Sequence, residues 1–114
     1  MALVDIGRHA EAVALLGPEL AAAPDDPDLL EALARAQSEI DPRAALATAR
    51  RLLAVEPVSL AGHYLAGALC DTLGDRSGAR AHAETAVRLY PDEPVAHALL
   101  ADVQRWKGAN RKAA

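Results

Sequence analysis

Residues 74–93 read GDRSGARAHAETAVRLYPDE, a glycine turn followed by a helical stretch that a proline closes. The arrangement recurs, because prolines 33 and 34 residues apart each follow an alanine by twelve residues; the pairs are Ala12 and Pro24, Ala45 and Pro57, and Ala79 and Pro91. The alanine series continues with Ala113, and Gly108 lies 34 residues after Gly74. A period of this size is typical of stacked helical hairpins, which act through their surfaces.

The residues that carry the period resemble the tetratricopeptide repeat family. The family's turn and second helix are matched by Gly7-Arg8-His9-Ala10-Glu11-Ala12 through Pro24-Asp25-Asp26, and again by Gly74-Asp75-Arg76-Ser77-Gly78-Ala79 through Pro91-Asp92-Glu93. The resemblance covers essentially the whole chain. It implies an all-α fold, a right-handed α-solenoid of antiparallel helix hairpins. One departure is that Leu30, His63 and His97 replace the large aromatic residue expected early in each first helix.

Stop signals and a 3.6-residue periodicity predict six helices, over residues 9–22, 27–40, 42–55, 59–73, 76–89 and 94–107. Residues 1–6 look like the last turns of a first helix, and residues 109–114 begin a second helix. We therefore expect a single domain, 1–114, made of a partial repeat (1–26), two full repeats (27–59 and 60–93) and another partial repeat (94–114).

The 33-residue interval indicates a deletion within residues 40–45. Ile6 precedes its marker alanine by six residues, whereas Ile40 precedes its own by five. The glycine turn is replaced there by Asp41-Pro42, in which Asp41 is placed to cap the next helix and Pro42 to open it. We expect a tighter elbow in this hairpin than in its neighbours.

The ends of the array are predicted to be uncapped. The last intact helix carries Leu99, Leu100, Val103 and Trp106, and no complete partner helix follows to cover them. Repeat arrays normally finish in an element with a polar outer face. Either flanking sequence is absent from this chain, or the ends associate with another copy to give a homo-oligomer.

Composition argues against several kinds of partner. A formal net charge of −4 and a pI near 5.5 disfavour nucleic acid, whose phosphates require a concentrated basic surface. The start of the chain has no basic segment before an apolar run, so no signal peptide or membrane span is expected. The single cysteine, Cys70, cannot form an internal disulfide, which suits the cytoplasm. Ten arginines against two lysines hint at a GC-rich bacterial genome.

The family resemblance implies that the first helices line a concave groove where a peptide or partner helix binds. Helical spacing selects the groove face. The partner-binding residues expected on it are Asp28, Glu31, Arg35, Glu39, Tyr64, Asp71, Asp102, Arg105 and Trp106. The same spacing adds Ser38, Ala61, Ala68, Thr72, Val95 and Ala98 to this face.

Charge and aromatic content suggest what this groove binds. Five acids face two bases, whereas arginines predominate on the second helices. A basic or neutral peptide is favoured, with Tyr64 and Trp106 as anchors because aromatic residues dominate binding hot spots. Trp106 could equally be a core residue at the end of the array. Capture of acidic chaperone tails is disfavoured, because only Arg35 is basic among the positions that would clamp a carboxylate.

No catalytic, cofactor or metal site is expected. His63 and His97 occupy the same repeat position and are interpreted as packing residues of successive layers, too far apart to share a metal ion. Cys70 is interpreted as a buried structural thiol. The sequence contains no phosphate-binding glycine loop, Ser-His-Asp arrangement or CxxC motif.

Two classes of function remain open. The chain is either an interaction scaffold or adaptor, or a helper segment of a larger bacterial enzyme or transcriptional regulator.

Overall fold

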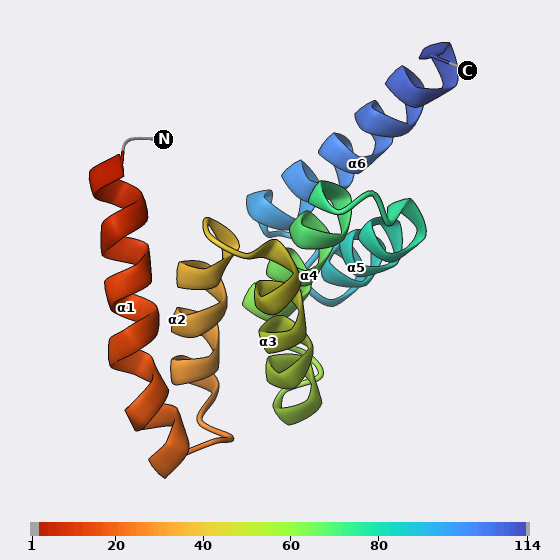
Figure 1. Ribbon diagram of the computed structural model, residues 1–114. Helices are drawn as coiled ribbons and strands as arrows, with labels where there is room; N and C mark the ends of the chain where they lie inside the picture. The colour runs from red at the N-terminus through yellow and green to blue at the C-terminus, as the bar shows by residue number, and fades with distance from the viewer. Residues whose placement is uncertain (1–2, 114) are drawn as a thin grey trace.

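The computed structural model describes the backbone of residues 3–113 and the side chains of residues 7–105. Within this range the chain is all-helical and contains no strand. The helices are α1 (Leu3–Ala22), α2 (Pro27–Ser38), α3 (Pro42–Val55), α4 (Leu60–Thr72), α5 (Arg76–Leu89) and α6 (Pro94–Ala113). Figure 1 shows them following one another from α1 at one end of the molecule to α6 at the other. No helix in the described part has the length and apolar character needed to cross a membrane.

Short connections and side-chain caps define these helices. Three or four residues separate each helix from the next, so neighbouring helices run antiparallel. Oxygens of Asp26 and Ser59 each accept a hydrogen bond at 2.9 Å from an N–H in the first turn of α2 and α4. Asp41 and Asp75 cap α3 and α5 in the same way. The cap predicted at Asp41 is confirmed, and both Asp26 and Asp41 are followed by a proline that needs no N–H partner.

The two three-residue elbows differ in backbone conformation. Between α4 and α5, Gly74 has φ of 87°, and the N–H of Asp75 bonds the carbonyl of Cys70 at 2.8 Å. Between α2 and α3, the N–H of Asp41 bonds the carbonyl of Gln37 at 2.7 Å, and no residue has a positive φ. The chain therefore reverses direction between α2 and α3 without a residue in the left-handed conformation, whereas Gly74 supplies one between α4 and α5.

The turns predicted at both ends of the array are wrong. Residues 1–6 were expected to form a separate helix before a turn at Gly7, but α1 continues through Gly7 from Leu3 to Ala22. At the other end, α6 continues through Gly108 instead of starting a new helix at residue 109. Glycine inside a helix costs only about 1 kcal/mol relative to alanine. A turn at glycine is therefore favoured over a continuous helix only where the next helix packs back on the first, as α5 packs on α4.

Packing between the helices separates two kinds of element. Each helix contacts the next along the chain, and α4 also contacts both α2 and α6, whereas α3 and α5 do not contact each other in the described part. The main buried cluster contains residues from every helix from α2 through α6 and is rich in alanine. A smaller leucine cluster contains residues from α1, α2 and α3. Small residues allow close approach: a Cβ on Gly67 of α4 would lie 2.9 Å from the Leu99 side chain of α6. The helices α2, α4 and α6 thus lie side by side.

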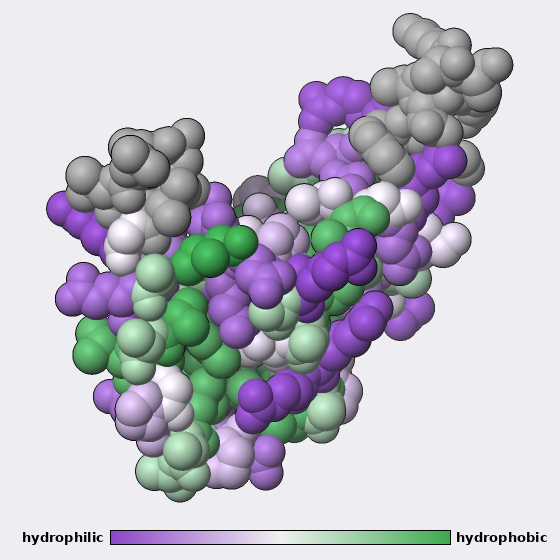
Figure 2. Space-filling model, viewed as in Figure 1, coloured by the Kyte–Doolittle hydropathy of each residue, from purple (hydrophilic) through white to green (hydrophobic). Residues whose placement is uncertain are grey.

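Apolar side chains are also visible on the surface. On the face seen in Figure 2, they gather where α1 and α2 lie side by side. Leu15 of α1 is the most exposed large apolar residue in the described part, at 67%. The α1 end of the molecule therefore carries apolar surface that the rest of the chain leaves uncovered.

Candidate binding groove

Three open hollows adjoin one another along α2, α4 and α6, and Tyr64 of α4 lines all three. The largest has a volume of about 560 Å³ and extends from α1 and α2 across α4. The second, of about 350 Å³, lies at the start of α4 beside Arg35 and Val95. The third, of about 270 Å³, lies between α4 and α6. We call this continuous concave surface the groove.

The structure brings together most of the residues that helical spacing placed on this face. The predicted binding residues that line the hollows are Arg35, Glu39, Tyr64, Asp71 and Asp102. The smaller predicted residues that line them are Ser38, Ala61, Ala68, Thr72, Val95 and Ala98. Helical spacing therefore placed these residues on one face, and the groove itself was expected from the family resemblance.

Four predicted binding residues lie outside the hollows or outside the described side chains. Asp28 and Glu31 lie earlier on α2 and do not line a hollow, although Glu31 contacts Arg35, which does. Arg105 lies on α6, paired with Asp102. The side chain of Trp106 falls outside the described residues, so its predicted role as an anchor stays a prediction.

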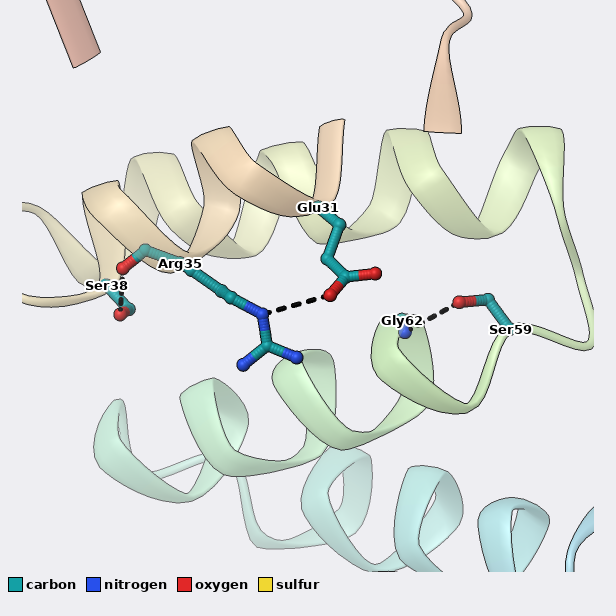
Figure 3. Close-up of polar contacts among 5 residues, drawn as sticks. All are labelled: Glu31, Arg35, Ser38, Ser59 and Gly62. Atoms are coloured by element: carbon teal, nitrogen blue, oxygen red, sulfur yellow. Dashed lines mark hydrogen bonds and ion pairs between the residues drawn. The ribbon is translucent and has the colours of Figure 1, made fainter. Parts of the chain in front are cut away.

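The charges of the groove are only partly neutralised. The Nε atom of Arg35 lies 3.1 Å from Oε2 of Glu31, one helical turn earlier (Figure 3), and Arg105 pairs with Asp102. Arg35, which lines the groove, and Arg105, which lies beyond it, are therefore each paired within their own helix. Within the described residues, Glu39 and Asp71 of the groove form no ion pair, so the residues that line the groove are acidic in balance.

Asp71 is the least satisfied of these acids. Its Oδ1 atom is buried and has no hydrogen-bond partner in the described part of the chain. The nearby hydroxyl of Thr72 donates to the carbonyl of Ala68 at 3.1 Å and does not help Asp71. A buried, unpartnered carboxylate oxygen is unfavourable by about 1–3 kcal/mol, so Asp71 has affinity for an incoming donor.

His9 is a groove residue that sequence reasoning missed. It was expected near a turn, but because α1 is continuous its side chain reaches the largest hollow, beside Arg35 and Glu39. Its Nδ1 atom is buried without a hydrogen-bond partner. No sequence signal could have placed His9 here, since the repeat pattern predicts a helix break two residues earlier.

Comparison with models of known protein families gives no match, and neither does comparison with curated proteins. What this groove does is therefore argued from its own chemistry.

Two histidines form a contact behind the groove. His63 is buried, and its Nε2 lies 2.8 Å from the carbonyl oxygen of Pro57, which can only accept, so Nε2 carries the hydrogen. The Nδ1 atoms of His63 and His82 are 3.1 Å apart, so the Nδ1–H of His82 donates to His63. Burial, followed by the neighbouring His63 and Arg50, lowers the pKa of His82. The bond therefore joins α4 to α5.

His97 and Cys70 are the other two side chains whose chemistry was considered from the sequence. His97 repeats the contact of His63, with its Nε2 at 2.6 Å from the carbonyl of Pro91. The described residues contain no cluster of three or more His, Cys, Asp or Glu side chains able to hold a metal. Cys70 is fully buried, and its pKa is raised first by that burial and then by Asp75. A protonated, inaccessible thiol is a poor nucleophile.

Proposed function

We propose that this chain is a tetratricopeptide-like scaffold, a right-handed solenoid of helix hairpins that binds a basic segment of a partner protein in the groove. The observation that carries the proposal is the position of Tyr64, which lines three adjoining hollows between α2, α4 and α6. An aromatic side chain with one polar tip can bury large area at low entropic cost, which suits it to anchor a ligand.

Charge selects the class of segment. The groove acids Glu39 and Asp71 have no ion pair among the described residues, and the groove arginine, Arg35, is already paired with Glu31. A lysine or arginine side chain entering beside Tyr64 would donate to the buried Oδ1 of Asp71. A charge-assisted hydrogen bond of this kind contributes about 1.5–3 kcal/mol, enough to favour a basic over an acidic segment.

The proposed role is binding without catalysis, in a bacterial cytoplasm. The burial and raised pKa of Cys70 support a structural thiol. The acidic balance of the chain supports a protein partner over a nucleic acid or an anionic membrane.

A peptide-display selection on the purified chain tests the proposal. We expect enrichment of peptides that carry lysine or arginine next to an apolar residue, and at least a tenfold loss of affinity in Tyr64→Ala and Asp71→Asn. Glu84→Gln, which removes an exposed acid from α5, is the matched control and should bind as the unmodified chain does. Selection of acidic peptides, or equal affinity in all three variants, would contradict the proposal.

A further inference from the structure

The α2–α3 hairpin shows how a second helix covers a first one. The hydroxyl of Thr48 on α3 donates to the side-chain oxygen of Gln37 on α2 at 2.5 Å. The residues on the same face of α3, about one helical turn before and after Thr48, are buried together with Thr48. The stripe comprises Ala45, Thr48, Ala49 and Leu52, none of them more than 4% exposed.

The equivalent stripe on α1 is only half covered: two of its residues are half-buried, one of them against the leucine cluster, and the other two are exposed. The residues 33 positions earlier are Ala12, Leu15, Leu16 and Glu19. Leu15, at the position of the buried Thr48, is 67% exposed, and Glu19, at the position of Leu52, is also exposed. α1 packs on α2, and its Leu20 joins the leucine cluster with α2 and α3, whereas the side of α1 that carries Leu15 and Glu19 is open in the described chain.

On α6, the uncovered side is the one that a following second helix would cover. The residues of α2 that lie beneath α3 are Leu30, Leu33, Ala34 and Gln37. Their equivalents on α6, 67 positions later, are His97, Leu100, Ala101 and Gln104. Leu30 and Ala34 are fully buried, whereas His97 and Ala101 are exposed. Although α5 contacts α6, the side of α6 that carries His97 and Ala101 has no cover in the described part of the chain.

We propose that the open stripe of α1 in one copy docks on the open stripe of α6 in a second copy, completing in trans the hairpin that α3 completes on α2. A first helix without a second lies at one end of the molecule and a second helix without a first at the other (Figure 1). The contact joins two different surfaces, so it is heterologous and builds head-to-tail assemblies.

The lengths of the terminal helices fit this pairing. Both α1 and α6 have 20 residues, whereas the four inner helices have 12 to 14. In an antiparallel pair, the backbone of α1 before Gly7 and that of α6 near Gly108 extend on the same side. Straight helices at both ends are then favoured over the turns that the repeat pattern predicts.

Charge supports the same alignment. Leu30 of α2 and Leu52 of α3 belong to one buried cluster. At the trans contact their positions are taken by His97 of one copy and Glu19 of the other. The Nε2 of His97 is bonded to the carbonyl of Pro91, which leaves Nδ1 toward the second copy. In the α4–α5 hairpin the equivalent Nδ1, that of His63, faces His82, whose position in α1 is that of Leu15. The imidazole of His97 and the carboxylate of Glu19, one helical turn beyond Leu15, would therefore lie near each other at the trans contact.

Sedimentation velocity of the 114-residue chain, from micromolar to millimolar concentration, tests the proposal. We expect concentration-dependent assemblies larger than a dimer. Leu15→Arg removes the α1 surface and Ala101→Arg the α6 surface, and each variant alone should be monomeric because a buried unpaired charge weakens association more than tenfold. Mixed together, the two variants should form a one-to-one dimer and nothing larger, since each still carries the surface that the other has lost.

Val58→Arg, at an exposed connection residue between α3 and α4, is the control and should assemble as the unmodified chain does. Far-ultraviolet circular dichroism checks that every variant keeps its helix content. The proposal is overturned if the unmodified chain is monomeric throughout, if either variant alone still associates, or if the mixture stays monomeric. The groove is a separate surface, so these results leave the peptide-binding proposal untouched.

Discussion

Substituting alanine for Gly7 and for Gly74, which the repeat makes equivalent, should change stability in opposite directions. Gly74 has φ of 87°, and a Cβ added there would meet no atom within 4 Å. The cost of Gly74→Ala is therefore conformational alone, about 1–2 kcal/mol for an L-residue in the left-handed region. The hydrogen bond from Asp75 to Cys70 that closes this elbow would be strained at the same time.

Gly7 lies inside α1 and is exposed, and a Cβ added there also meets nothing within 4 Å. Alanine has the higher helix propensity, so Gly7→Ala should stabilise the protein by up to about 1 kcal/mol. The two variants should then differ by about 2–3 kcal/mol in the free energy of unfolding.

Urea unfolding followed by circular dichroism measures this difference. In a thermal scan the variants should lie on either side of the unmodified chain, because about 1 kcal/mol shifts the Tm of a domain near this size by about 4 °C. A destabilisation of Gly7→Ala equal to that of Gly74→Ala would refute the reasoning, since it would mean that residue 7 forms the left-handed turn predicted from the repeat and that α1 is not continuous.

Three further predictions concern the core, pH and the thiol. Leu30→Ala removes a fully buried side chain and should lower the free energy of unfolding by about 2–5 kcal/mol, whereas Val58→Ala, at an exposed position, should change it by less than about 0.5 kcal/mol in the same urea titration. The pKa of His82 is lowered in the folded chain, so near its ordinary value of 6.5 the His82 imidazole takes up a proton in the unfolded chain and stays neutral in the folded one. The free energy of unfolding should therefore be highest above pH 6.5 and fall progressively as the pH drops below it. Urea midpoints measured across this range should lose that pH dependence in His82→Gln. Cys70 should react with a thiol reagent far more slowly in the folded protein than in urea, and equal rates would show that the thiol is accessible.

Local chemistry and periodicity were sufficient to predict most of the groove from sequence. Asp26 and Asp41 cap helices because a short acidic side chain satisfies free N–H groups in the first turn, wherever the helix packs. Tyr64 and Asp71 were assigned to the groove because residues three, four and seven apart share a helix face. These properties depend on neighbours within a few residues, and the sequence determines them directly.

The tertiary structure alone decided whether each glycine makes a turn and which side chains meet across helices. Gly7 and Gly74 occupy equivalent positions, yet only Gly74 turns, because α5 packs back on α4, whereas the described chain has no helix before Gly7 for α1 to pack back on. The bond between His63 and His82 spans 19 residues and depends on how two helices approach. A turn costs helical hydrogen bonds and a buried polar contact needs exact placement, so both outcomes depend on packing energy that no local pattern contains.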